Sequence, residues 1–125
     1  MKKILGLIYV SMLTLCLFSF PVQATEKETD NEMIKYALIR SLDPSIDKAL
    51  AEIYKDTPRG IPQWAGWETE ITNIKQLYGV GVAYEVTVKV FPYYGPHIGN
   101  GIDEITIRIA SGGQEVIDYK HIHDV

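Results

Sequence analysis

The sequence predicts an α+β fold, in which two short helices pack on a four-stranded antiparallel sheet. Three observations indicate this fold. Apolar residues recur at helical spacing up to about residue 54, strictly alternating patterns begin after residue 66, and short turns join the alternating segments. Sequential strands with short turns form an antiparallel meander, and the helices can cover one of its faces.

Two helices are expected in the first half of the exported chain. The first is predicted over residues 31–41, because residues 29–32 (TDNE) have the spacing of a capping box. The second begins at Asp43 and Pro44, since aspartate can cap a helix and proline in the first turn loses no hydrogen bond. Each helix is expected to bury one face against the rest of the domain. In the first helix this stripe contains Ile34, Ala37, Leu38 and Ser41. In the second it contains Ile46, Leu50, Ile53 and Tyr54.

Four strands are expected after the Pro- and Gly-rich segment 56–66, over residues 67–77, 82–91, 102–110 and about 114–122. The alternation predicts which side chains face inward: Val82, Tyr84, Val86, Val88 and Val90 in the second strand, and Ile105, Ile107 and Ile109 in the third. In shape, this order resembles a cystatin-like or NTF2-like layout, in which a helix packs across a curved sheet. Such folds carry binding, inhibition and catalysis alike, so the layout implies no activity.

The N-terminus predicts export. Lys2 and Lys3 precede the uncharged apolar residues 4–20, and Val22 and Ala24 occupy the small-residue positions of a cleavage site. Residues 1–24 are therefore expected to be a secretory signal peptide, cut between Ala24 and Thr25. Residues 25–30 are then a flexible leader, and residues 31–125 form a single α+β domain.

Two alternatives to a cleaved signal remain open. The apolar run is at the lower limit for spanning a hydrocarbon core of about 30 Å, which allows an uncleaved anchor. Cys16 lies inside the run, which allows a lipid anchor, although a bulky leucine stands where lipoprotein signals have a small residue.

Composition excludes several functions for the exported domain. Removing Lys2 and Lys3 leaves 10 basic residues of 12 against 16 acidic ones, so the net charge changes from −4 to −6. An acidic domain repels phosphate backbones, and no nucleic-acid partner is expected. Cys16 is the only cysteine, so the domain has neither a disulfide nor thiol chemistry. The sequence has no phosphate loop or dinucleotide fingerprint, and no cofactor is expected.

The second half of the chain carries a more specific resemblance. Residues 94–109 read YGPHIGNGIDEITIRI, and residues 116–121 read VIDYKH. These segments resemble a family of small secreted proteins from Bacillus-type Gram-positive bacteria, which is identified as the domain-of-unknown-function family DUF3888. The likeness covers roughly residues 35–122. It implies export and a single domain, and it provides no catalytic or binding residue.

Aromatic residues in loops indicate a binding surface. Trp64 and Trp67 flank Ala65 and Gly66 in one connection, and Phe91, Tyr93, Tyr94 and His97 lie in or next to the Pro- and Gly-rich loop 92–101. Loop aromatics with a backbone restrained by Gly and Pro are typical of patches that bind protein, peptide or glycan. The alternative is that Trp67 and Phe91 cover the edges of a small core. The expected binding residues are Trp64, Trp67, Tyr93, Tyr94 and His97.

Histidines suggest a second kind of site. His121 and His123 alternate along the last predicted strand, so that both side chains leave the same face, and His97 lies in the Pro- and Gly-rich loop 92–101. If that loop folds toward the strand end, His97, His121 and His123 can bind zinc or copper, with Asp124 as a further ligand. Otherwise these histidines are polar residues of a loop and a fraying C-terminus.

Carboxylates and serines offer little evidence of catalysis. Glu68 and Glu70 are expected on one strand face, with Glu85 and Glu104 on neighbouring strands, where a pair can hydrolyse sugars. The competing interpretation is a solvated sheet face, balanced by Lys75, Lys89, Arg108 and Lys120. The serines that follow the signal, Ser41, Ser45 and Ser111, lie in no nucleophile-elbow sequence.

The leading hypothesis is a non-catalytic, exported binding module of the extracellular space or cell envelope. Its partner is an extracellular protein, a peptide or a cell-wall glycan, and it contacts the membrane only through the signal before cleavage. It is not expected to be an enzyme. The alternative is a metal-binding or hydrolytic domain that uses His97 with His121 or His123, and a structural role in a spore or envelope also remains open.

Overall fold

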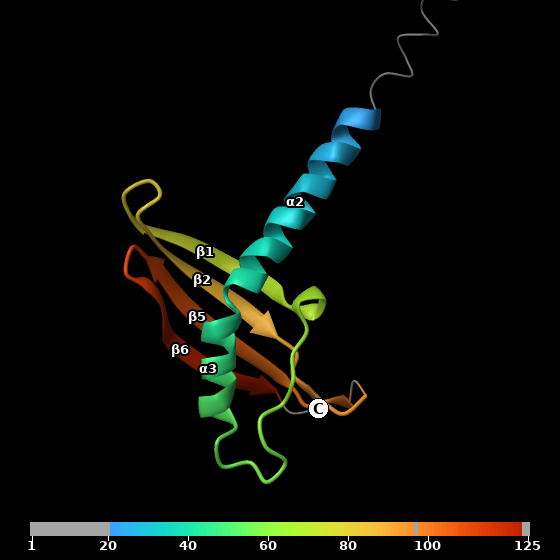
Figure 1. Cartoon of the computed structure of the whole chain (residues 1–125), viewed down its shortest axis with the longest axis vertical. Coiled ribbons are helices and arrows are strands. Elements are labelled where there is room, and N and C mark those ends of the chain that lie inside the picture. Colours follow the sequence, from blue (N-terminus) through green and yellow to red (C-terminus); the bar gives the residue numbers. More distant parts are fainter. Residues whose placement is uncertain (1–20, 97, 124–125) are drawn as a thin grey trace, which may run out of the picture. The chain divides into compact units, whose positions relative to one another are not determined.

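The computed structural model describes residues 21–96 and 98–123 (Figure 1). The chain divides into two compact units, residues 1–34 and 35–125. Most of the predicted signal peptide, including Cys16, lies outside the described residues, as do His97 and Asp124. Among the helices of the described part, none is long and apolar enough to cross a membrane.

Helix α2 spans Pro21–Ser41 and therefore begins well before the predicted start at residue 31. Residues 25–30, predicted to be a flexible leader, are helical, and the predicted capping box lies inside the helix. Glu26, Lys27 and Glu28 favour helix, so the helix runs through Thr29 and does not begin there.

Helix α3 spans Asp43–Ile53, with Pro44 in its first turn as predicted. Its predicted stripe is confirmed, since Ile46, Leu50 and Tyr54 are buried. The stripe predicted for the preceding helix is confirmed only at Leu38, which packs against the core, and it was wrong at Ile34, which is exposed. Ala37 and Ser41 are exposed, whereas Ile39 and Leu42 are fully buried. Burying the two larger aliphatic side chains removes more apolar surface from water.

Four strands form an antiparallel meander in the order β1-β2-β5-β6, which confirms the predicted topology. Their bounds are Glu70–Tyr78, Ala83–Val90, Ile102–Ala110 and Gly113–His123. Strand β1 is confirmed, but it begins after the 3₁₀ helix η1, Gly66–Glu68, so the predicted start at residue 67 was wrong. The Thr69 hydroxyl donates a 2.9 Å hydrogen bond to the Ala65 carbonyl and holds this turn in place.

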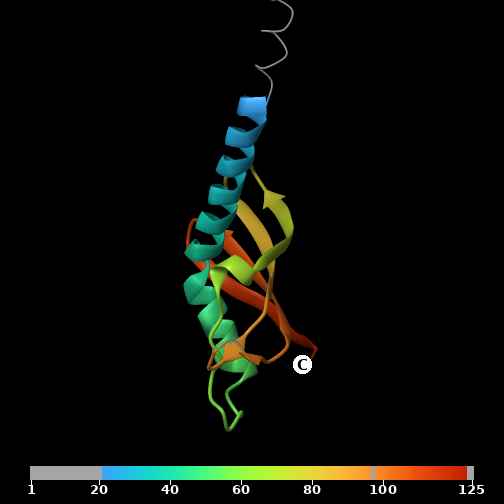
Figure 2. The same cartoon turned by 90° about the vertical axis from the view of Figure 1, so that its right-hand side faces the viewer.

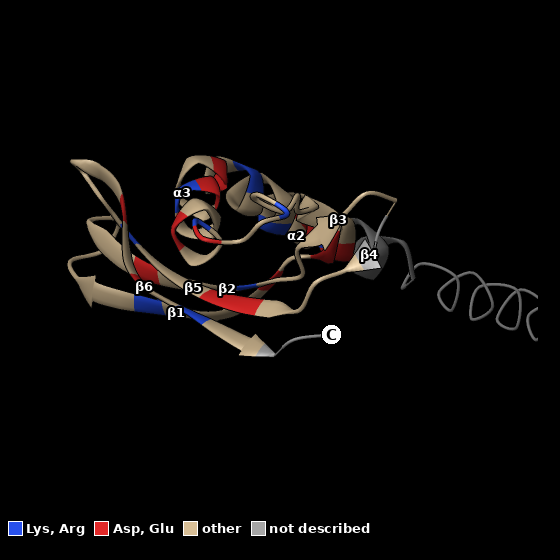
Figure 3. Ribbon diagram, turned by 90° about the horizontal axis from the view of Figure 1, so that it is seen from below, with Lys and Arg blue, Asp and Glu red and all other residues tan. Residues whose placement is uncertain are grey.

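Helix α3 covers one face of this sheet (Figures 1, 2 and 3). On the covered face, the predicted inward residues Val86, Val88, Val90, Ile105 and Ile107 are almost fully buried against α3. On the opposite face, the cross-strand neighbours have complementary chemistry, and they pair Glu85 with Arg108, Thr87 with Thr106, and Lys89 with Glu104.

Three predicted inward residues near the strand ends behave differently, and one of them, Tyr84, is only half-buried. Val82 precedes strand β2 and is 46% exposed, because it belongs to the turn rather than to the pleated strand. Ile109 is only half-buried. The loop 92–101 also contains a small ribbon that the sequence does not predict, formed by β3, Tyr93–Tyr94, and β4, Ile98–Gly99.

Candidate functional site

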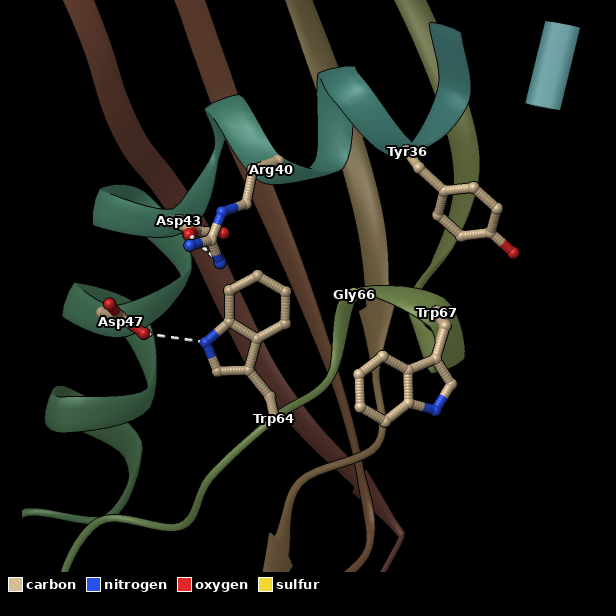
Figure 4. A pocket seen from close by; sticks show the side chains of 7 residues that line it. All are labelled: Tyr36, Arg40, Asp43, Asp47, Trp64, Gly66 and Trp67. Carbon is tan, nitrogen blue, oxygen red and sulfur yellow. Dashed lines mark hydrogen bonds and ion pairs between the residues drawn. The ribbon is translucent and has the colours of Figure 1, made fainter. Parts of the chain in front are cut away.

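A surface cavity of about 540 Å³ lies where the last turns of α2, the start of α3 and the turn at η1 meet (Figure 4). We call it the aromatic groove, because three of its residues are aromatic. Both tryptophans of the chain line it. Its lining residues are Tyr36, Arg40, Asp43, Asp47, Trp64, Gly66 and Trp67.

The two tryptophans are held in different ways. The indole N–H of Trp64 donates a 2.7 Å hydrogen bond to Asp47 Oδ1, and its ring packs partly against the hydrophobic core (Figure 4). Trp67 lies on η1 and is 68% exposed. Trp64 is therefore anchored at both ends, whereas Trp67 presents a large apolar surface to solvent.

Charged side chains from the helices complete the groove. Asp43 and Asp47 are one helical turn apart on α3, so both side chains reach the same side (Figure 4). Arg40 forms a 2.8 Å ion pair with Asp43 Oδ2. Asp43 Oδ1 is buried and has no hydrogen-bond partner within residues 21–96 and 98–123. The groove thus combines exposed aromatic rings with an acceptor whose bonding capacity is unused.

Trp67 also borders a second cavity of about 590 Å³, which we call the neighbouring hollow. Tyr93 and Phe91 line it together with Glu68, Glu70 and Lys35. Two hollows on the same surface therefore share one exposed tryptophan.

The predicted binding residues are divided among these features. Trp64 and Trp67 line the aromatic groove, and Tyr93 lines the neighbouring hollow. Tyr94 makes internal contacts, because Arg59 lies 4.3 Å from its ring centroid and its hydroxyl donates a 2.7 Å hydrogen bond to the Gly60 carbonyl. His97 lies outside the described residues.

A buried polar network lies elsewhere, between α3 and the strands β5 and β6. Asp103 is fully buried, and its Oδ2 accepts a 2.6 Å hydrogen bond from the Tyr54 hydroxyl. Its Oδ1 is 2.7 Å from Nδ1 of His121. Burial, followed by the hydrogen bond to Asp103, raises the pKa of Tyr54 well above its ordinary value.

The network fixes one side of the His121 imidazole. A carboxylate only accepts hydrogen bonds, so an ionised Asp103 requires a proton on Nδ1. The His121 side chain is 30% exposed. His123 ends strand β6, and its side chain lies outside the described ones.

The four predicted glutamate residues do not meet at one site, since Glu68 and Glu70 line the neighbouring hollow and the other two lie elsewhere. Glu85 and Glu104 lie on the outer face of the sheet, in 3.5 Å ion pairs with Arg108 and Lys120 respectively. Glu68 belongs to η1 and Glu70 begins β1, so the prediction that they share a strand face was wrong.

Several residues of these sites were not predicted from the sequence, namely Tyr36, Arg40, Asp43 and Asp47 in the groove and Tyr54 and Asp103 in the network. Two sequence signals were available. Asp43 and Asp47 are spaced i, i+4 on a predicted helix, and Asp103 has the same parity as the inward Ile105 and Ile107.

A family model described as a protein of unknown function, DUF3888, matches residues 34–123, which include both the groove and the network. The chain belongs to this family. No curated protein and no solved structure matches the chain.

Proposed function

We propose that this DUF3888 protein is an exported, non-catalytic binding module of the extracellular space or cell envelope, and that it holds its ligand in the aromatic groove. One observation carries the proposal: both tryptophans of the chain line one cavity, and Trp67 is 68% exposed. Exposing a large apolar side chain such as tryptophan to water is unfavourable, and tryptophan is enriched at the centres of binding surfaces.

The architecture around the groove supports this assignment. Hydrogen bonding to Asp47 and packing against the core hold Trp64 in place, so little side-chain freedom is lost when a ligand binds. Arg40 and Asp43 supply a donor and an acceptor at the edge of the apolar surface. A mostly apolar cavity with a few placed polar groups is typical of ligand sites.

Export is the second part of the proposal, and it depends on the N-terminal sequence. Basic Lys2 and Lys3, the apolar residues 4–20 and the small residues before Thr25 have the order of a secretory signal. The intact mass of the protein from culture fluid and cell envelope tests it. We expect a chain that begins at Thr25, and a full-length or lipidated mass in the envelope would contradict cleavage.

Intrinsic fluorescence tests the groove directly, because it is lined by both tryptophans of the chain. We expect a member of a panel of cell-wall fragments, glycans and extracellular peptides to shift the emission saturably. Trp67→Ala should abolish binding in calorimetry, whereas Tyr78→Ala, which removes another exposed aromatic side chain, should leave it unchanged. Binding that survives Trp67→Ala would place the ligand elsewhere.

The buried network favours one second candidate, a metal-binding or hydrolytic domain centred on His121. Asp103 contacts Nδ1 of His121 at 2.7 Å, and an orienting carboxylate behind an imidazole is typical of metal ligands and general bases. Zinc titration by calorimetry distinguishes the two candidates. Stoichiometric binding that is lost in His121→Ala and retained in Trp67→Ala would favour the second.

A further inference from the structure

The charges in the aromatic groove indicate what kind of ligand it accepts. Asp43 and Asp47 contribute two carboxylates and Arg40 one guanidinium group, so the groove lining has a formal charge of −1. Across Trp67, the neighbouring hollow contains Glu68, Glu70 and Lys35, which again sum to −1. The whole chain is also acidic, with a formal charge of −4. Opposite charge on a ligand speeds its encounter and selects it over acidic competitors.

The two carboxylate oxygens of Asp43 are satisfied unequally. Arg40 satisfies Oδ2, but Oδ1 is buried and lacks a partner within the described part of the chain. A buried acceptor without a donor destabilises the protein, and the penalty is larger for a charged group. Because Oδ1 is out of reach of solvent, a ligand does not bind this atom directly, but a cation held beside Asp43 still stabilises its carboxylate through opposite charge.

Aromatic rings beside carboxylates form a suitable site for a cation. The faces of Trp and Tyr attract ammonium and guanidinium groups, and Trp does so most strongly. The protein already uses this chemistry internally, because Lys35 lies 4.9 Å from the Tyr36 centroid and Arg59 lies 4.3 Å from that of Tyr94. Trp67, with its large exposed surface, offers the same interaction to a ligand.

We propose that the aromatic groove binds a Lys or Arg side chain of an extended basic peptide segment, and that this segment passes Trp67 toward the acidic neighbouring hollow. The proposal rests on the binding function proposed above and adds the class of ligand to it. The aromatic faces contact the aliphatic stem and the cationic head, while Asp43 and Asp47 supply the opposite charge.

A short acetylated oligolysine amide is the probe, and a neutral N-acetylglucosamine oligomer and an oligoglutamate are the comparison ligands. We expect saturable binding of oligolysine alone, measured by tryptophan emission and by calorimetry. Affinity should fall as salt is raised, because the charges are partly exposed and therefore screened. Trp67→Ala should abolish it.

Charge-matched variants separate a specific site from general attraction. Asp47→Asn retains an acceptor for the Trp64 N–H while removing the charge, and it should weaken oligolysine binding by about 2- to 5-fold. Asp43→Asn should weaken binding by at least as much. Asp118→Asn makes the same change at an exposed position on strand β6, and it should leave affinity within experimental error.

The outcomes separate this inference from the function on which it rests. Binding of the neutral glycan in a manner dependent on Trp67, without binding of oligolysine, would overturn the basic ligand and retain the binding function. Equal weakening by Asp118→Asn and Asp47→Asn would overturn the site, because only the net charge would then matter. Loss of every ligand response in the wild-type protein would overturn both proposals.

Discussion

The buried network and the aromatic groove both combine aromatic and acidic side chains, but their polar groups are satisfied differently. In the network, Asp103 is fully buried and both of its oxygens have partners from within the protein. In the groove, Trp67 is 68% exposed and Asp43 Oδ1 has no partner among the described residues. A carboxylate with both oxygens paired stabilises the fold, whereas the exposed ring of Trp67 is available to a ligand.

The largest effect is expected when the centre of the network is removed. Asp103→Ala leaves the Tyr54 hydroxyl without its acceptor and leaves His121 Nδ1 without the carboxylate. We expect the free energy of unfolding to fall by about 2–4 kcal/mol, since buried polar groups lose a charged partner. Urea unfolding measures this loss.

Asp118→Ala is the control, because Asp118 is exposed on strand β6. That variant should remain within about 0.5 kcal/mol of the wild type. An equally small effect of Asp103→Ala would contradict a stabilising network and would strengthen the candidate in which His121 has a functional role.

A medium effect is expected at Tyr54, and it depends on pH. The folded state raises the pKa of Tyr54, so an unfolded chain loses this proton first as the pH rises above about 10. The unfolded state then binds fewer protons than the native state, and stability falls by up to about 1.4 kcal/mol per pH unit. The stabilisation is fully present below pH 10 and is lost above it.

Tyr54→Phe removes this titration together with one hydrogen bond to Asp103. At neutral pH, the variant should be less stable by about 1 kcal/mol, and its unfolding free energy should depend less on pH between about 10 and 11. Tyr78→Phe, at a 63% exposed position, serves as the comparison in the same urea titrations. A slope in Tyr54→Phe as steep as in the wild type would assign the alkaline transition to another group.

The sequence predicts the sheet well because its evidence is local. Alternation along residues 102–110 identifies strand β5 and its inward isoleucines, and Ser111 and Gly112 mark the turn to β6. The buried face of helix α2 was harder to predict. Helical spacing favoured a face with Ala37 and Ser41, whereas the structure buries the larger side chains of Ile39 and Leu42. Tertiary packing decides that competition, and local spacing does not report it.

Sites depend on contacts that are distant in sequence. Trp64 and Trp67 were predicted because aromatic residues in loops are conspicuous in the sequence. The partner of Trp64, Asp47, was not predicted, because it lies on a separate helix. The network joins Tyr54, Asp103 and His121 from three elements. Only the register of β5 with β6, which pairs Asp103 with His121, brings the last two together. The strand register cannot be derived from the local pattern of residues, so this pairing was not predicted.

A smaller effect on stability should distinguish the two tryptophans of the groove. Trp64→Phe removes the hydrogen bond to Asp47 and part of the contact with the core, and it should lower the unfolding free energy by about 1 kcal/mol. Trp67→Phe retains a ring at an exposed position and should stay within about 0.5 kcal/mol of the wild type. Thermal unfolding of the two variants measures the difference, and equal losses would show that Trp67 is also a structural residue.

The smallest change is spectroscopic, and it leaves the fold intact. Each Trp→Phe variant retains one tryptophan, so acrylamide quenching reports Trp67 alone in Trp64→Phe and Trp64 alone in Trp67→Phe. We expect steeper quenching and redder emission for Trp67, because solvent reaches most of its surface. Addition of a ligand that fills the groove should protect Trp67 more than Trp64. Equal protection of both would contradict the prediction that the ligand lies mainly on Trp67.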